Sequence, residues 1–319
     1  KDEVIDRTET YSDDKNQETI EVSLFKYSKY NKFKDEATFI NTTRYYISNY
    51  NDFVIKDEKI TRNTDGLQID FLLTDTNSTQ TKLSRVLLKN SAKYVLSSNI
   101  DPLLGPSQFI KKFYDNFKPI DSITGQNLFT DKSDLFFDDI LSGDTNRINY
   151  ARNNFQLMTI PAGKKNKLVD LFGNMPVIED YTEFKNSLYG LFESVPDKET
   201  IDFLKAQYSK AGDTASYQVT ILRTLAAMKT PEATIAFKEL ITTEPPLDDE
   251  SSILLNLYQD SADLAKLLFP DIFQLLTYDE YKDEVYHLLS VCVWKGKISP
   301  DMYKDKVNAM LSTAKTQLK

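Results

Sequence analysis

Apolar residues change their spacing once along this chain, across a connector at 118–132 that contains Pro119 and Gly125. Before it, segments such as 67–73 alternate apolar and polar residues, the two-residue period of a half-buried strand. After it, apolar residues recur three and four positions apart, as on a helix with one buried face. The sequence therefore predicts an α+β protein in which an antiparallel sheet precedes an all-helical region.

Four consecutive strands are predicted in the first region, with room for one or two more in residues 19–50. Asp65 and Gly66 lie between the segments 53–60 and 67–73, and Asp-Gly between two such segments favours a tight hairpin. Two further strands are predicted at 83–88 and 93–96. A polar turn precedes each of them.

The segments before and after these four strands define a module at 19–118. Residues 1–18 are polar and acidic, and we assign them to a leader outside the fold. Residues 37–50 suit a strand or a helix, and we favour a strand. Ser107 then begins a helix that would cover one face of the sheet. Its apolar residues follow helical spacing: Phe109, Ile110, Phe113, Tyr114 and Phe117.

Antiparallel strands followed by a helix that starts near Ser107 and runs into Phe117 resemble the PsbP/Mog1-like α/β sandwich. The resemblance covers 19–118 and rests on topology, without a diagnostic motif. It implies a fold for this module and no activity.

The helical region, 133–319, shows recurring start signals. Thr230-Pro231-Glu232 combines a hydroxyl cap, a proline in the first turn and an acid, and Ser299-Pro300-Asp301 repeats it. Val195-Pro196-Asp197 is a weaker copy. The three prolines are 35 and 69 residues apart, which indicates a unit of roughly 35 residues built from two helices. Buried stripes are predicted at Tyr181, Phe184, Leu188 and Leu191; at Tyr217, Ile221, Leu225 and Met228; and at Ala233, Phe237, Leu240 and Ile241.

Two family resemblances concern this region. Residues 215–233, a helix, a tight turn with small residues and a second helix, resemble a HEAT repeat, which implies an α-solenoid. Segments 134–141 and 208–215 resemble the C-terminal region of large bacterial TraB/GumN-type proteins. The Gly-x-x-His motifs of that family's protease-like domain are missing here, because Glu284 stands at the glycine position before His287. No catalytic residues therefore carry over.

Net charge and cysteine content exclude several kinds of partner. At −9 the chain repels nucleic acid phosphates and anionic membranes, and it has no apolar run near the ~18 residues of a membrane span. The lone Cys292 forms no internal disulfide or thiolate cluster. We expect a processed product, because the chain opens at Lys1, and an extracytoplasmic bacterial location. The oligomeric state is left open.

Asp283, His287 and Ser290 are the one grouping that resembles an acid, base and nucleophile. They lie at i, i+4 and i+7, and three residues on successive turns of one helix rarely form a triad. Cys292 follows His287 by five positions, about 140° round a helix, so it points elsewhere. Nucleotide-binding and metal-binding motifs are also missing. The sequence predicts no enzyme, no cofactor and no metal site.

Acidic and aromatic pairs receive structural interpretations. Asp138-Asp139 and Asp279-Glu280 border helical segments, where acids would complement the helix dipole. The aromatic pairs Tyr45-Tyr46 and Phe136-Phe137 are predicted to be core and staple residues.

A non-enzymatic module that binds a protein or peptide is the leading hypothesis. Stacked helix pairs form an extended groove, predicted to be lined by Lys205, Gln207, Lys238 and Glu239. The alternative is an accessory C-terminal region of a larger TraB/GumN-like peptidase whose catalytic domain lies outside this chain. A stand-alone hydrolase using the His287 grouping is a third hypothesis.

Overall fold

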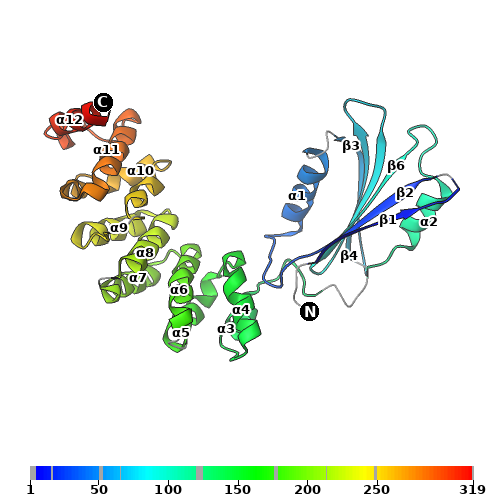
Figure 1. The fold of residues 1–319 in the computed structure, drawn as a ribbon, viewed down its shortest axis with the longest axis horizontal. Helices are drawn as coiled ribbons and strands as arrows, with labels where there is room; N and C mark the ends of the chain where they lie inside the picture. Colours follow the sequence, from blue (N-terminus) through cyan, green and yellow to red (C-terminus); the bar gives the residue numbers. More distant parts are fainter. Residues whose placement is uncertain are drawn as a thin grey trace. The chain divides into compact units, whose positions relative to one another are not determined.

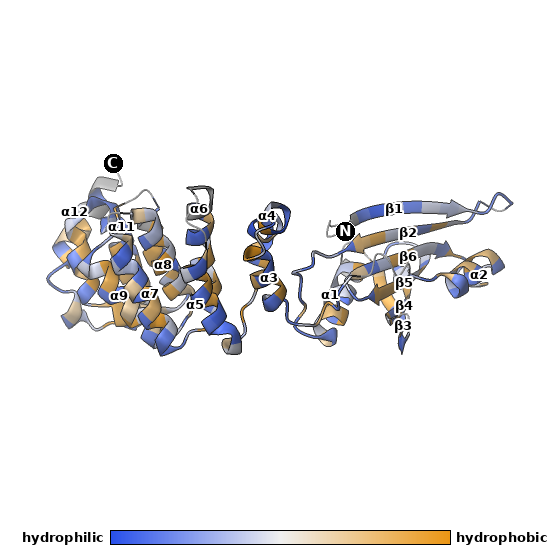
Figure 2. Cartoon of the chain, turned by 90° about the horizontal axis from the view of Figure 1, so that it is seen from below, coloured by the Kyte–Doolittle hydropathy of each residue, from blue (hydrophilic) through white to orange (hydrophobic). Residues whose placement is uncertain are grey.

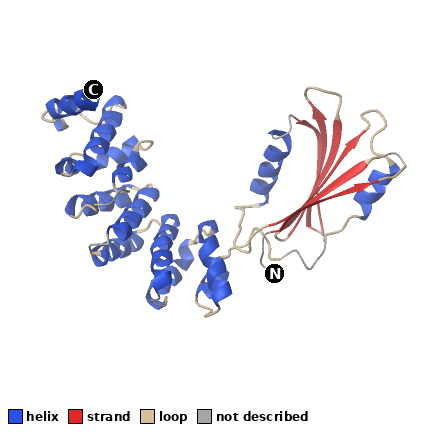
Figure 3. Ribbon diagram, in the orientation of Figure 1, coloured by secondary structure: helices blue, strands red, loops and turns tan. Residues whose placement is uncertain are grey.

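A computed structural model describes 5–15, 17–49, 53–64, 66–119, 125–175, 179–212, 214–247 and 250–317. The chain forms two compact units. The first comprises Lys1–Asp139 with Asp144–Met158, and the second comprises Ile140–Gly143 with Thr159–Lys319. The described strands lie in the first unit and most helices lie in the second (Figure 3), which confirms the α+β fold class.

One antiparallel sheet forms the centre of the first unit (Figure 1). Its order is β1-β2-β6-β5-β4-β3, so the predicted four-strand meander runs consecutively from β3 to β6. At the predicted hairpin Asn63 pairs with Gly66, whose φ is +115°, and a side chain at Gly66 would collide with the Leu88 carbonyl. The strands are β1 (Ile5–Ser12), β2 (Thr19–Lys26), β3 (Phe53–Asn63), β4 (Gly66–Asp75), β5 (Thr81–Lys89) and β6 (Ala92–Ile100).

The prediction of a polar leader at 1–18 is wrong for the strand β1. This strand pairs with β2 along its whole length at the edge of the sheet. Thr8 and Ser23 join their hydroxyls at 2.9 Å, and the ring of Tyr11 packs on Phe113 at 5.0 Å. An edge strand with polar residues on both faces lacks the alternation that marks a half-buried strand, and Figure 2 shows β1 mainly in hydrophilic colours.

The strand favoured at 37–50 is a helix, α1 (Glu36–Asn49). Asp35 starts it, because its carboxylate accepts the Thr38 amide at 2.7 Å. Phe39, Ile40 and Ile47 then pack on the sheet face that contains Ile69 and Phe71. The β-branched and aromatic content of this segment favours strands, but the cap and this packing outweigh local propensity.

A second helix, α2 (Gln108–Asn116), covers the opposite face of the sheet, in the segment where the sequence predicted a helix over one face. Ser107 is its N-cap and accepts the Ile110 amide at 3.3 Å. Ile110 and Tyr114 pack with Leu87 and Leu96 in a separate core cluster. The sheet is therefore sandwiched between α1 and α2, where the sequence predicted a single covering helix.

Two further helices belong to the first unit: α4 (Thr145–Asn154), followed by η2 (Phe155–Leu157), and nearly all of α3 (Ser133–Ile140). The sequence placed them in the solenoid because of their helical period. Their side chains pack instead on the segment that follows β2: the ring of Tyr30 lies 5.5 Å from those of Phe136 and Tyr150.

The second unit consists of α-helices and 3₁₀ turns that follow one another along the chain. Two predicted start signals cap helices here, Asp197 before α7 and Thr230 before α9, while Ser299-Pro300 begins only a single 3₁₀ turn. No described helix has the length and apolarity needed to cross a membrane. The elements are η3 (Ala162–Lys164), α5 (Lys165–Asn174), α6 (Glu179–Ser187), η4 (Leu188–Ser194), α7 (Lys198–Ala211), α8 (Ala215–Ala227), α9 (Pro231–Thr243), η5 (Ser252–Tyr258), α10 (Ala262–Ala265), η6 (Lys266–Leu268), η7 (Asp271–Thr277), α11 (Asp279–Trp294), η8 (Pro300–Met302) and α12 (Val307–Gln317).

These helices form two layers. In the first layer α7 contacts α9, and α9 contacts η6 and η7; in the second, η4, α8, η5 and α11 contact one another in that order. The predicted stripes face the space between them, and their buried members are Phe184, Leu188, Leu191, Ile221, Leu225, Met228, Ala233, Phe237 and Ile241. The side chain of Tyr181 lies outside the described part of the chain.

Candidate functional site

All four residues predicted for docking lie in the first layer of the helical unit. Lys205 on α7 forms an ion pair with Glu239 on α9 at 2.5 Å. Lys238, also on α9, pairs with Asp271 on η7 at 2.6 Å. Gln207 accepts a hydrogen bond from the Tyr189 hydroxyl at 3.3 Å. The three charged residues therefore already join neighbouring helices of one layer.

Polar contacts of this kind recur at nearly constant separation along the second unit, and we call the set the ladder. Lys165 pairs with Glu199, Lys205 with Glu239, and Lys297 with Asp263, each 34 residues apart. Hydrogen bonds to backbone carbonyls show the same spacing: Tyr208 to Glu244 over 36 residues and Tyr281 to Pro246 over 35. These separations agree with the predicted unit of about 35 residues.

The second layer ends in an edge that the sequence did not indicate. Lys229, just after α8, donates to the Leu257 carbonyl at 2.6 Å, and Lys295, just after α11, donates to the Gln259 carbonyl at 3.1 Å. Trp294, beside Lys295, is 84% exposed, and Leu257 is 38% exposed. We call Lys229, Leu257, Trp294 and Lys295 the tryptophan edge.

Helical spacing could have located Trp294. The buried residues of α11 include Leu288, Leu289 and Cys292. Trp294 is two positions beyond Cys292, about 200° round the helix, so it points away from the core. An aromatic side chain such as that of Trp294 is usually expected to be buried, but its position round the helix predicts that it is exposed.

The acid, base and nucleophile grouping lies on one exposed surface of α11. Asp283, His287 and Ser290 are all exposed, and Ser290 donates its hydroxyl to the carbonyl of Tyr286 at 2.9 Å, within its own helix. Cys292 is fully buried, as predicted, and burial raises the pKa of its thiol to about 11.

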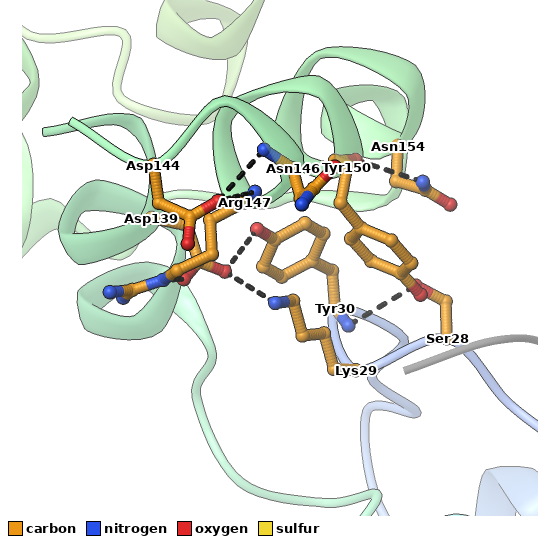
Figure 4. A network of polar contacts seen from close by, with 9 residues as sticks. All are labelled: Ser28, Lys29, Tyr30, Asp139, Asp144, Asn146, Arg147, Tyr150 and Asn154. Atoms are coloured by element: carbon orange, nitrogen blue, oxygen red, sulfur yellow. Dashed lines mark hydrogen bonds and ion pairs between the residues drawn. The ribbon is translucent and has the colours of Figure 1, made fainter. Parts of the chain in front are cut away.

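A buried carboxylate lies at the centre of a polar cluster in the first unit (Figure 4). Asp139, at the end of α3, has a side chain 1% exposed. Lys29 pairs with it at 2.8 Å, Arg147 on α4 at 2.7 Å, and the Tyr30 hydroxyl donates to it at 2.5 Å. Tyr150 completes the cluster by donating to Ser28 at 2.9 Å. We call this set the Asp139 cluster.

The interpretation of Asp138-Asp139 as acids that complement a helix dipole is wrong. Both lie in the last turn of α3, where the dipole disfavours negative charge. Burial also acts to raise the pKa of Asp139, but hydrogen bonds from Lys29, Tyr30 and Arg147 outweigh it and hold this pKa below its ordinary value. Asp139 is thus ionised near neutral pH, which suits a structural anchor better than a proton donor.

The aromatic pairs differ from one another. Phe136 and Phe137 are buried, as predicted. Tyr45 and Tyr46 are more than half exposed on α1 and stack edge to face on each other at 5.6 Å, so their prediction as core residues is wrong.

Comparisons with known proteins give no relative from which a role could be transferred. No protein-family model, curated protein or solved structure matches this chain. Among the described residues, no three His, Cys, Asp or Glu side chains are grouped so as to hold a metal ion.

Proposed function

We propose that the helical unit is a docking platform for a protein or peptide segment, and that its repeats are HEAT-like. The exposure of Trp294 on a regular helix carries this proposal. Tryptophan is one of the residue types enriched among those that dominate binding energy in protein interfaces. A largely solvated indole costs hydrophobic free energy that a partner would recover.

The tryptophan edge also offers a fixed arrangement of groups. Lys229 and Lys295 are held by the carbonyls of Leu257 and Gln259, so the ends of α8, η5 and α11 are joined. A partner with an apolar residue for Trp294 and an acidic residue for the lysines would fit this edge. Rigid presentation lowers the entropy lost on binding.

Selection from a random peptide library by the purified chain tests the proposal. We expect wild type and the control Leu311→Ala, which removes another exposed apolar residue of the same unit, to enrich one common motif. Trp294→Ala should bind that motif at least about tenfold more weakly while keeping its helical circular dichroism. Failure of wild type to enrich any motif relative to Trp294→Ala would refute the proposal.

The ladder residues predicted for docking are tested with the same peptides. Lys205→Glu with Lys238→Glu reverses two charges on the first layer and places each beside an acid. If Lys205, Gln207, Lys238 and Glu239 line the site, this variant loses affinity for acidic peptides. Unchanged affinity would remove these four residues from the site and leave the tryptophan edge.

A further inference from the structure

A cavity lies between α1 and the sheet in the first unit, apart from the Asp139 cluster. Its volume is about 370 Å³. Small-molecule sites in proteins commonly enclose roughly 300–1,000 Å³ and combine apolar walls with a few polar groups. The cavity is therefore at the lower end of the range for a small ligand.

The walls of this cavity are mostly apolar. Val86 and Val95 form the sheet side, and Phe39 and Ile47 form the helix side. Phe33, from the segment before α1, adds an aromatic ring. Such a lining favours a hydrocarbon chain or a ring over a polar molecule.

Lys93 on β6 is the one cation among the residues that line the cavity. Its strand neighbours in register are Leu88 on β5 and Phe25 on β2. The ammonium lies 5.5 Å from the ring centre of Phe25 and 5.9 Å from that of Tyr27. Within the described part of the chain it has ring contacts but no ion pair.

The electrostatic environment of Lys93 leaves its charge poorly compensated. Burial lowers the pKa of Lys93, and the carboxylate of Asp6, on β1, acts in the opposite direction. Asp6 is exposed and does not line the cavity. An anion inside the cavity would supply the counter-charge at short range, where partial burial strengthens the attraction.

Hydroxyl groups on α1 complete the polar part of the lining. Thr42, Thr43 and Tyr46 border the cavity, and Tyr46 is 55% exposed. The exposure of Tyr46, a residue that the sequence predicted to be core, marks where the cavity meets solvent. One polar group of a ligand could thus reach water while its apolar part stays between helix and sheet.

We propose that this cavity binds an amphiphilic monocarboxylate with a medium-length apolar chain, whose carboxylate pairs with Lys93. The chain lies between Val86, Val95 and the aromatic residues of α1 and its preceding segment. This site is in the sheet unit, so it is independent of docking at the tryptophan edge.

Calorimetric titration of the full chain with decanoate, kept below its micelle concentration, tests this site. We expect one saturable site in wild type. Lys93→Met keeps the apolar stem and removes the charge, and it should weaken decanoate binding by about tenfold, the usual loss for a hydrogen bond to a charged group. The neutral decanol should bind wild type and Lys93→Met equally, because it uses the walls alone.

Two further variants make the result decisive. Val95→Phe fills the cavity and should abolish binding of both ligands. Lys112→Met removes an exposed lysine from α2, on the opposite face of the sheet, and should leave decanoate binding unchanged. The proposal is overturned if wild type shows no saturable heat, if Lys93→Met binds decanoate as wild type does, or if Lys112→Met weakens binding equally.

Discussion

The two units place their charges differently. In the sheet unit one carboxylate, Asp139, is buried and receives three donors from two separate segments of the chain. In the helical unit, ion pairs such as Lys205–Glu239 are half exposed and recur at the repeat length. A buried cluster depends on every member, whereas each exposed pair contributes little by itself. The units should therefore respond unequally to the loss of one charge.

Removal of the buried charge is expected to have the largest effect. Asp139→Asn leaves Lys29 and Arg147 without their shared partner, and breaking a buried pair costs about 3–5 kcal/mol. We expect the lower end, because the side chain of Arg147 is 44% exposed. Hydrogen exchange of the full chain in urea, read at peptides from β4 and β5, measures this loss separately from the helical unit.

Asp138→Asn is the matched control for that variant. It makes the same chemical change one residue away, at an exposed position of α3. Its effect should stay within about 0.5 kcal/mol, the usual range for surface substitutions. Equal destabilisation by the two variants would show that the Asp139 cluster is not an anchor.

Acid should affect the sheet unit through the same carboxylate. The pKa of Asp139 is lowered in the folded state, so its contribution is complete above the unfolded value near 3.8 and is lost as pH falls toward the folded value. We expect the urea midpoint of the sheet unit to decrease as the pH is lowered from about 5 to about 3. Asp139→Asn should lose part of this dependence; an unchanged pH profile would contradict the assignment.

A buried hydroxyl of the helical unit should give an intermediate effect. Tyr208 donates to the carbonyl of Glu244 at 2.5 Å from a side chain that is almost fully buried. Tyr208→Phe leaves that carbonyl without this partner, at a cost of about 1–3 kcal/mol. Urea unfolding followed by circular dichroism measures the change.

Tyr258 provides the comparison, because its hydroxyl is buried and forms no hydrogen bond of full geometry within the described residues, although it interacts with the Thr234 side chain. Tyr258→Phe should be close to neutral, since it removes a buried polar group without a well-formed hydrogen bond. A loss as large as that of Tyr208→Phe would mean that ring packing, and not the hydrogen bond at the repeat spacing, is being measured.

Elements marked by a local sequence pattern could be predicted, whereas elements held by contacts with distant parts of the chain could not. Alternation over β4 and the cap at Thr230 are local patterns, and both were found where predicted. Strand β1 was missed because its residues are polar on both faces, and it is held by pairing with β2. Helix α1 was taken for a strand because packing on the sheet overrode its propensity.

The candidate sites depend even more on distant contacts. Asp139 is 109 residues from Tyr30, so no local pattern marks it as buried. Lys93 is unusual because β6 faces α1, a helix in a segment where the sequence favoured a strand. The ladder, in contrast, follows from the repeat. Lys205 and Glu239, both predicted for docking, are about one repeat apart in sequence and form an ion pair in the structure.

The smallest expected effect concerns that pair. Lys205 and Glu239 are 39% and 51% exposed, so solvent screens their attraction, and exposed pairs are typically worth about 0.2–1 kcal/mol. Lys205→Met and Glu239→Gln should each reduce the free energy of unfolding slightly, and the double variant should lose less than the sum. A double-mutant cycle in urea at low and high salt isolates the coupling, which salt should reduce. Coupling of several kcal/mol, or coupling that salt does not change, would place this ladder with the buried cluster and abolish the contrast between the two units.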